Sequence, residues 1–285
     1  MEEDVQPTLM ALSGDDEFPL PEALAAHGPA RVIAMCNQKG GVGKTTTAIN
    51  LGAALATYGR KVLIVDFDPQ GAASVGLGIN ALELDQTVYT LLMNPRAQVK
   101  EAVQQTAVRN LDVLPANIDL SAAEVQLVNE VARESALSRI LRPLIDDYDV
   151  IIIDCQPSLG LLTVNALTAA HGVIVPVETE FFALRGVALL VETIETVRDR
   201  INPRLRIDGI VPTMVDSRTI HSREVMERLE ETFGDLVYDT KINRTVKFPD
   251  ASVATEPITT YAPSHPGAKA YMRLAREVIS RGEAP

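Results

Sequence analysis

Tryptophan is absent from the 285-residue sequence, and aromatic residues make up only 4% of it. A sizeable core must then be built from Ala, Val, Leu and Ile, which suits buried parallel strands covered by helices. Cysteine is also scarce, because only Cys36 and Cys155 occur, and each ends an apolar run. Their separation argues against a zinc knuckle or an iron–sulfur centre and predicts buried free thiols in a reducing cytosol.

Long apolar runs are missing as well. No run reaches the roughly 18 apolar residues that a membrane-spanning helix needs. The N-terminus carries acids where a signal peptide carries basic residues. We therefore expect a cytoplasmic protein with no membrane partner.

Basic residues are lacking in residues 1–30, which hold seven acids. Of the net charge of -12, this segment carries -7 and leaves -5 for residues 31–285. The segment has no sustained helical or strand period, so we expect an acidic, disordered tail in front of a single domain over 31–285. The overall charge disfavours nucleic acid, whose phosphates need a basic surface, but the uneven distribution weakens that argument.

From Arg31 onward, short β-branched runs alternate with amphipathic stretches. The order predicts an α/β fold with a doubly wound, mostly parallel sheet and helices on both faces. The expected strands are 31–36, 61–66, 111–116, 149–154, 172–177, 205–213 and 236–240. The expected helices include 45–59, 121–142, 185–201, 221–233 and 266–281.

The segment NQKGGVGKTTT, residues 37–47, stands between the first strand and the first helix. Its glycines let backbone N–H groups converge on an anion, the helix N-terminus adds a favourable dipole, and Lys44 adds a positive charge. Thr45 offers a hydroxyl to Mg²⁺. The usual pattern has glycine at position 38, whereas this loop has Gln38 followed by a second lysine. The predicted nucleotide contacts are Lys39, Gly40, Gly41, Val42, Gly43, Lys44, Thr45 and Thr46.

Carboxylates follow two other buried strands. Asp66 and Asp68 end the run KVLIVDFD, and Asp154 ends VIIID. We expect one of Asp66 and Asp68 to face a metal and the other to face the reacting water. The carboxyl ends of parallel strands meet at one edge of a sheet, where such folds bind ligands. The phosphate loop and these acids are therefore predicted to form one nucleotide and Mg²⁺ site.

The segments KGGVGKTTT, VDFDPQGAAS, IIIDCQPSLGLLTVNAL and PTMVDSRT resemble the ParA/Soj family of deviant Walker A partitioning ATPases, in the branch shared with MinD. The resemblance covers residues 31–281. It implies a Mg²⁺-dependent ATP hydrolase that changes from a monomer, with ADP or without nucleotide, to a homodimer with ATP.

The resemblance also assigns roles to individual residues. It implies that Lys39 reaches across the dimer to the partner's nucleotide and that Asp68 is needed for hydrolysis. Together with the phosphate-loop lysine Lys44, these are the predicted catalytic residues. The predicted metal ligands are Thr45, Asp66 and Asp154.

A further implication of the resemblance is binding of non-specific duplex DNA in the ATP state, stimulation by a ParB-like or condensation-type protein, and association with the nucleoid. Residues 198–247 hold ten Lys or Arg against nine acids, which is more basic than the rest of the chain. A dimer would present each basic residue twice, so weak half-sites would act together. The DNA-binding candidates are Arg218, Arg223, Arg244 and Lys247.

Two other functions remain open. A MinD-like membrane cycle would need a basic amphipathic helix at the C-terminus, whereas residues 266–281 fit a helix packed on the sheet more simply. A P-loop small-molecule ligase would require a metabolite for turnover and would not respond to DNA. ATP turnover with and without duplex DNA separates these functions.

Overall fold

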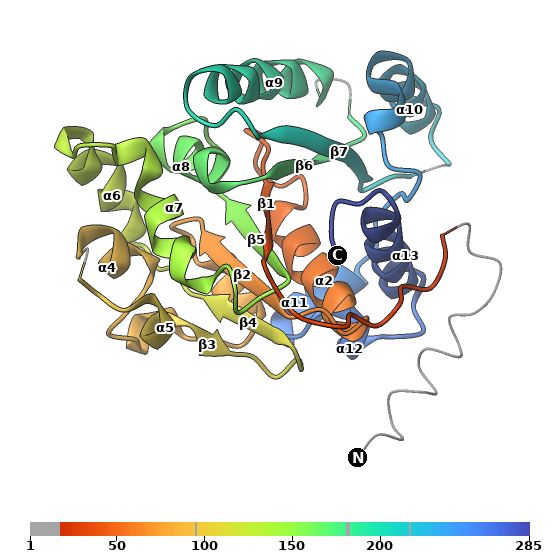
Figure 1. Ribbon diagram of the computed structural model, residues 1–285. Coiled ribbons are helices and arrows are strands. Elements are labelled where there is room, and N and C mark those ends of the chain that lie inside the picture. The colour runs from red at the N-terminus through yellow and green to blue at the C-terminus, as the bar shows by residue number, and fades with distance from the viewer. Residues whose placement is uncertain (1–17, 95, 181–182, 217) are drawn as a thin grey trace.

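The structure is a computed structural model that describes residues 18–94, 96–180, 183–216 and 218–285 (Figure 1). Its strands are β1 (Arg31–Met35), β2 (Val62–Phe67), β3 (Gln104–Gln105), β4 (Leu111–Leu114), β5 (Val150–Cys155), β6 (Gly172–Glu178) and β7 (Arg206–Thr213). Its α-helices are α2 (Lys44–Thr57), α3 (Ala72–Gly76), α4 (Val88–Met93), α5 (Val99–Ala102), α6 (Leu120–Gln126), α7 (Ala136–Leu141), α8 (Leu161–Ala169), α9 (Ala183–Arg200), α10 (Ile220–Phe233), α11 (Lys247–Val253), α12 (Ile258–Tyr261) and α13 (Pro266–Ser280). Short 3-10 turns lie at η1 (Ala81–Glu83), η2 (Leu127–Asn129), η3 (Arg133–Ser135), η4 (Arg142–Leu144) and η5 (Gly234–Leu236).

The strands form one sheet in the order β3-β4-β2-β5-β1-β6-β7. Every neighbouring pair is parallel except β3 and β4, so the predicted mostly parallel sheet is confirmed. From β1 the chain crosses to β2 and then to β4, returns to β5 beside β1, and continues to β6 and β7 on the other side of β1. Ligands bind at the carboxyl ends of strands where the order reverses in this way, which places the expected site beside β1.

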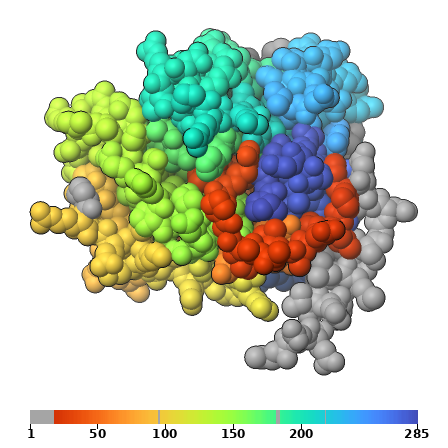
Figure 2. Space-filling model, in the orientation of Figure 1, coloured from red at the N-terminus to blue at the C-terminus, as the bar shows by residue number. Residues whose placement is uncertain are grey.

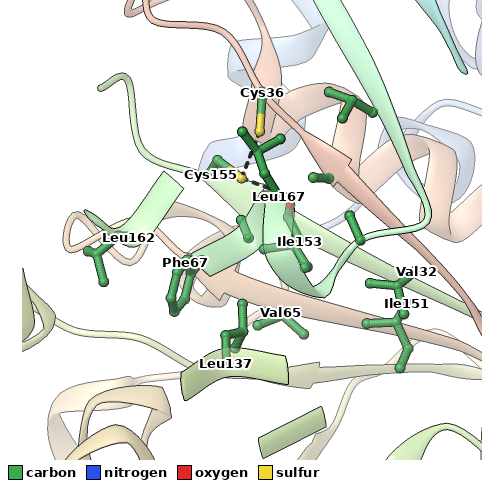
Figure 3. Packing of buried hydrophobic residues seen from close by; sticks show 14 of the residues in the cluster. Val32, Cys36, Val65, Phe67, Leu137, Ile151, Ile153, Cys155, Leu162 and Leu167 are labelled. Atoms are coloured by element: carbon green, nitrogen blue, oxygen red, sulfur yellow. Dashed lines mark hydrogen bonds between the residues drawn. The ribbon is translucent and has the colours of Figure 1, made fainter. Parts of the chain in front are cut away.

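Both faces of the sheet are covered, because alternate residues of each strand enter two separate cores. Val65 and Phe67 of β2 pack with helices such as α7 and α8, while Ile64 packs with α2 and α13 on the other face. Figure 3 shows the first core, in which the side chains of β1, β2 and β5 face Leu137, Leu162 and Leu167. The predicted doubly wound architecture is therefore confirmed.

The two cysteines meet in this first core. Cys36 follows β1 and Cys155 ends β5, and both are buried free thiols, as the sequence predicts. Their Sγ atoms lie 3.1 Å apart (Figure 3). The sequence separation of the pair concealed this contact, which the pairing of β1 with β5 creates.

The strand predicted at 236–240 is wrong. Residues 234–236 form η5, and Val237 makes only an isolated bridge to Ile210. The backbone N–H groups of Asp239 and Thr240 donate to the carboxylate of Glu277, at 2.8 and 2.9 Å, in place of a neighbouring strand. A side chain of α13 thus satisfies the donors that a ladder would have used.

The single helix predicted over 121–142 is also wrong, because the segment is divided into α6, η2, η3 and α7. Ala132 adopts a left-handed backbone with φ of 53°, which a continuous helix does not allow. The side chain of Asn165 then accepts from Leu137 N and donates to Arg133 O, so it satisfies the interrupted backbone. The apolar period was misleading, since Val125 and Val131 are 75% and 89% exposed.

Residues 18–30 differ from the disordered tail that the sequence predicts there, because they contact the domain along its surface (Figure 2). The Phe18 ring lies under the Arg273 guanidinium at 5.0 Å. Arg60 donates to the Glu22 carbonyl at 2.9 Å, and His27 Nδ1 lies 2.8 Å from a carboxylate oxygen of Asp149. Residues 1–17 of the predicted tail lie outside the described residues.

The helix predicted at 266–281 is confirmed as α13, and it packs against α2 through Leu274, Ala275 and Val278. Over the described ranges, none of the helices combines the length and the apolar character needed to cross a bilayer.

Candidate functional site

The phosphate loop lies between β1 and α2 and leaves the helix N-terminus open. Gly41 and Gly43 have φ of 75° and 86°, a left-handed backbone that glycine adopts at low cost. No side chain caps α2, and its first turn contains no acid. The first N–H groups of this 14-residue helix therefore remain available to an anion, which the helix dipole also favours.

Neighbouring strands hold the loop in place. The Thr213 hydroxyl, at the end of β7, donates to the Val42 carbonyl at 2.8 Å. The Asn37 amide donates to the Pro176 carbonyl of β6 at 2.8 Å and accepts from Lys39 N at 3.0 Å. These bonds fix the loop against the sheet edge before any ligand arrives, so little ordering is needed on binding.

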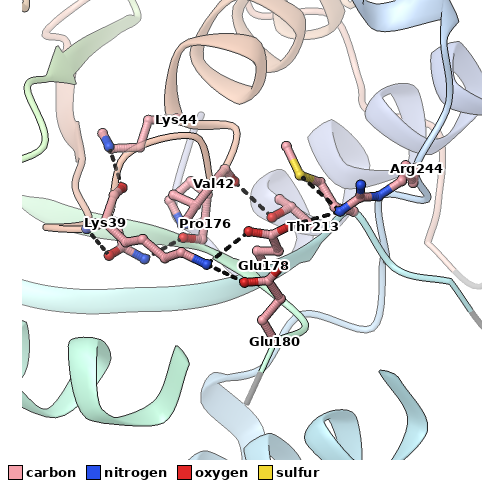
Figure 4. A network of polar contacts seen from close by, with 10 residues as sticks. Lys39, Val42, Lys44, Pro176, Glu178, Glu180, Thr213 and Arg244 are labelled. Carbon is pink, nitrogen blue, oxygen red and sulfur yellow. Dashed lines mark hydrogen bonds and ion pairs between the residues drawn. The ribbon is translucent and has the colours of Figure 1, made fainter. Parts of the chain in front are cut away.

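Lys44 begins α2 and points back into the loop (Figure 4). Its side chain is buried, and Nζ donates to the Lys39 carbonyl at 3.0 Å. Burial lowers the pKa of Lys44, while the nearby carboxylate of Asp154 opposes that shift. The ammonium group is therefore placed in the loop with a weak neutral partner that an anion can replace.

Asp66 and Asp154 come together from neighbouring strands. They are register partners in the β2–β5 pair, and both are completely buried. Asp66 accepts from Ser74 N at 2.8 Å and from the Ser74 hydroxyl at 2.7 Å. Burial raises the pKa of Asp66 to about 6 in spite of these bonds.

Asp154 lacks such partners. Within the described residues neither carboxylate oxygen has a hydrogen bond of normal length. Burial raises its pKa well above the ordinary value and Asp66 raises it further, although the Thr45 hydroxyl and Lys44 lie near enough to oppose the shift. An unsatisfied buried carboxylate beside a threonine hydroxyl fits a bound cation, which would satisfy both oxygens.

This set of oxygen donors suits magnesium. In the described part of the chain, no group of three or more His, Cys, Asp or Glu side chains could enclose a metal ion. Mg²⁺ does not need such a group, because it keeps several waters and takes one or two protein oxygens together with substrate phosphates. Thr45 and Asp154 would hold it, and Asp66 contributes only if it exchanges part of its Ser74 contact.

Asp68 follows β2 and is half-buried beside the loop. One of its oxygens accepts from Gln70 N at 2.9 Å, which fixes the carboxylate. Asp68 is near enough to Lys44 and Asp154 to act on the pKa of each. The geometry thus brings the predicted catalytic acid to the same edge as the loop and the buried acids.

Lys39 is turned away from the loop interior toward the end of β6 (Figure 4). Its Nζ lies 3.0 Å from Glu178 Oε2 and 2.6 Å from Glu180 Oε2. The two acids raise the pKa of Lys39, although its partial burial acts in the opposite direction. Sequence reasoning missed both acids, since nothing in the loop indicates its partners more than a hundred residues away.

Sequence reasoning also missed a cavity next to the start of α2. The cavity has a volume of about 320 Å³ and lies between the loop, the end of β7 and α11. Its largely apolar lining with a few polar groups is typical of a small-molecule pocket. Apart from Gly43 and Thr46 of the phosphate loop, the lining residues carry no motif, so the sequence offered no signal beyond their position at or after the end of β7. Those that line it include Gly43, Thr46, Thr213, Met214, Asn243, Phe248 and Pro249.

The basic candidates lie near one another after β7, but most are paired. Arg244 N donates to Val215 O at 3.2 Å, which places the Arg218 and Arg244 loops side by side. Arg218 makes two bonds of 2.8 Å to Asp216, and Lys247 lies 2.9 Å from Asp250. Arg244 contacts Glu178, and Arg223 is exposed on α10. The local field is therefore less positive than the basic residues alone indicate.

Comparisons with known proteins agree on one family. A family model described as an AAA domain matches residues 30–207. The chain is 61% identical over 264 residues to an uncharacterised protein of Mycobacterium tuberculosis, covering 93% of this chain and 83% of that protein. It is 47% identical over 252 residues to the sporulation initiation inhibitor protein Soj of Bacillus subtilis, covering 88% of this chain and 99% of Soj.

A solved structure has the same fold. It is the crystal structure of cobyrinic acid a,c-diamide synthase from Mycobacterium smegmatis with bound ADP and magnesium, with a TM-score of 0.78. The two sequences are 42% identical, and the match covers 89% of this chain and 96% of the other.

Proposed function

Because the chain belongs to the ParA/Soj family of P-loop ATPases, its chemistry is Mg²⁺-dependent ATP hydrolysis, and we propose that it uses this reaction to partition chromosomes or plasmids. One observation supports the proposed site most strongly. The buried carboxylate of Asp154 has no hydrogen-bond partner in the described structure and lies near Thr45 and Lys44 at the start of α2, whose N-terminus no side chain caps.

The residues of the loop act on the phosphates of ATP. The first N–H groups of α2 bind the phosphate oxygens, and Lys44 leaves the Lys39 carbonyl to contact them. Thr45 and Asp154 would hold Mg²⁺, which would neutralise charge on the phosphates. Asp68 orients the attacking water, since phosphoryl transfer depends mainly on position and charge.

The proposed homodimer depends on Lys39, the additional lysine of the phosphate loop. In the ATP state Lys39 leaves Glu178 and Glu180 and reaches the phosphates of the partner protomer's nucleotide. Its half-exposed side chain, 41% accessible, allows this movement. With ADP the γ-phosphate is lost, so the lysine returns to its own acids and the dimer separates.

The dimer binds non-specific duplex DNA and associates with the nucleoid. Arg218, Arg223, Arg244 and Lys247 contact the phosphates, each presented twice by the dimer. Since three of these cations have acidic partners, DNA phosphates must replace carboxylates, and the affinity is moderate and strongly salt-dependent. A ParB-like or condensation-type protein stimulates hydrolysis and ends the cycle.

A small-molecule ligase is the second candidate. Cobyrinic acid a,c-diamide synthase from Mycobacterium smegmatis, whose name is that of such an enzyme, is 42% identical to this chain. A ligase would turn ATP over only with its acid and amine substrates present.

ATP turnover tests the choice. We expect slow hydrolysis by the wild type, stimulation by duplex DNA together with the partner protein, and no effect of added small carboxylic acids with an ammonia donor. Turnover that ignores DNA and partner but requires such an acid and an ammonia donor would contradict the partitioning proposal and support the ligase.

A further inference from the structure

One carboxylate joins two of the proposed functional cations. Glu178 Oε2 lies 3.0 Å from Lys39 Nζ, and Glu178 Oε1 lies 2.9 Å from Arg244 Nη2 (Figure 4). Lys39 comes from the phosphate loop, whereas Arg244 lies more than two hundred residues later. Glu178 therefore connects the nucleotide site to the basic loops after β7.

The carboxylate is the fixed member of this group. Glu178 is the last residue of β6, in register with Thr213 of β7, and its side chain is only 11% exposed. The next residue, Thr179, is anchored by a 2.8 Å contact between its hydroxyl and that of Ser222. Lys39 and Arg244 are longer and 41% and 63% exposed, so they can leave while the carboxylate stays.

Glu180 provides an internal comparison. Its carboxylate lies 2.6 Å from Lys39 Nζ, closer than that of Glu178. Among the described residues, Arg244 makes its carboxylate hydrogen bond to Glu178 and none to Glu180. Two acids of equal charge, two positions apart, thus differ in whether they hold Arg244.

We propose that Glu178 is a positioning residue that restrains Lys39 and Arg244 together in the single protomer. This inference rests on the proposed function, because it assigns Lys39 to the partner's nucleotide and Arg244 to DNA. While Glu178 holds Lys39, the lysine cannot contact a second protomer's phosphates. While it holds Arg244, it neutralises a charge that DNA phosphates would otherwise meet.

If Glu178 restrains both cations, removing it should favour both dimer formation and DNA binding. Dimer formation requires Lys39 to exchange its own acids for the partner's nucleotide, so removing one acid favours the dimer. DNA binding requires Arg244 to exchange Glu178 for a phosphate, so removing Glu178 favours DNA. A residue that only supported the fold would weaken both processes when substituted.

The test compares E178Q with E180Q in the full chain. In light scattering with Mg²⁺ and a non-hydrolysable ATP analogue, either variant should reach half-maximal dimerisation at a protein concentration roughly 2- to 25-fold lower than the wild type. The range follows because one surface ion pair changes an equilibrium constant by up to about fivefold and a dimer contains two Lys39 side chains. Thermal unfolding without nucleotide serves as the fold control for both variants.

DNA affinity then separates the two acids. Measured on fully dimerised protein over a range of salt, E178Q should bind duplex DNA more tightly. Its slope of log affinity against log salt should be steeper, because no Glu178 carboxylate is released to take up a cation when Arg244 contacts a phosphate. E180Q should keep the wild-type slope, although it carries the same change of charge. The double variant E178Q/R244Q should return to a slope no steeper than that of the wild type.

The outcomes distinguish this inference from the function on which it rests. If the wild type dimerises with the ATP analogue and E178Q dimerises no more readily, the restraint is disproved and the proposed function stands. Equal salt slopes for E178Q and E180Q would disprove the link to Arg244. A wild type that stays monomeric with the ATP analogue would overturn both.

Discussion

Asp66 and Asp154 face each other on the neighbouring strands β2 and β5, completely buried, yet only Asp66 has hydrogen-bond partners among the described residues. The two acids look alike in the sequence, where each ends an apolar run. The contact with Ser74 makes Asp66 a structural acid as well as a candidate ligand, and it leaves Asp154 as the group with free oxygens. This difference has opposite consequences for the two substitutions.

Asp154→Asn should stabilise the nucleotide-free protein and abolish its response to Mg²⁺ and ATP. The substitution removes an unsatisfied buried carboxyl group, which should raise the free energy of unfolding by about 1–3 kcal/mol near neutral pH. Without the carboxylate, Mg²⁺ and ATP should no longer raise the melting temperature. Calorimetry with and without Mg²⁺ and ATP measures both effects.

Asp66→Asn is the matched control, because Asp66 is as completely buried as Asp154 but has hydrogen-bond partners. It loses the carboxylate that accepts from Ser74 N and the Ser74 hydroxyl, so the nucleotide-free protein should become less stable. A destabilised Asp154→Asn, or one that still responds fully to Mg²⁺ and ATP, would contradict the role given to Asp154.

Asp68→Ala should bind ATP with Mg²⁺ and accumulate as a dimer while its hydrolysis falls. The half-buried carboxylate is placed to position water and does not hold the phosphates, so the loss should be roughly 100-fold or more in turnover with little change in affinity. Single-turnover hydrolysis and nucleotide titration separate the two quantities. Unchanged turnover would remove Asp68 from the mechanism.

Arg218→Glu should abolish DNA retention and leave ATP-driven dimerisation intact. The side chain is 88% exposed and its partner Asp216 is on the surface, so the fold should not change. Arg204→Glu is a control with the same charge change before β7, at the opposite edge of the sheet. Equal loss of DNA binding in both variants would indicate a general charge effect and contradict a local DNA-binding patch.

Glu283→Gln should reduce the pH dependence of stability. Glu283 accepts from the Tyr238 hydroxyl, and burial raises the pKa of the carboxyl group from 4.5 to about 7. The folded state therefore holds the proton of Glu283 more tightly than the unfolded state does. The resulting stabilisation of the fold is fully present below about pH 4.5 and is lost as the pH rises through about 7. Urea unfolding at about pH 5 and pH 8 should show a loss of up to about 3 kcal/mol from this group in the wild type and a smaller loss in the variant.

The exposed Glu230, which pairs with Lys241 on the surface, supplies the control for that experiment. Glu230→Gln should retain the wild-type dependence on pH. If Glu283→Gln retained it as well, the buried Glu283 carboxyl would not be its source.

The sequence predicted the phosphate loop and the sheet edge well, because their chemistry is local. Gly-Lys-Thr between a strand and a helix has few other uses, and parallel strands bring Asp66, Asp68 and Asp154 to one edge wherever their order places them. The alternation of strands and helices likewise indicated the doubly wound sheet. The wrong strand at 236–240 failed where a distant side chain, Glu277, took the backbone donors.

Ion pairs between side chains on different strands and loops could not be predicted from the sequence. The contacts of Lys39 with Glu178 and Glu180, and of Arg244 with Glu178, depend on which strands become neighbours and on rotamers at their ends. The same is true of the pairing of Arg218 with Asp216, because a count of basic residues does not show which are neutralised. Such contacts decide whether a candidate cation is free to act.

The proposed nucleotide-switched dimer is tested most directly by light scattering of the wild type and Lys39→Ala, each with Mg²⁺ and either ADP or a non-hydrolysable ATP analogue. The wild type should have the mass of one chain with ADP and twice that mass with the analogue. Lys39→Ala should bind the analogue, as calorimetry can confirm, and remain at the mass of one chain. A wild type with the same mass in both nucleotides, or a Lys39→Ala variant that doubles its mass as the wild type does, would contradict the proposed switch.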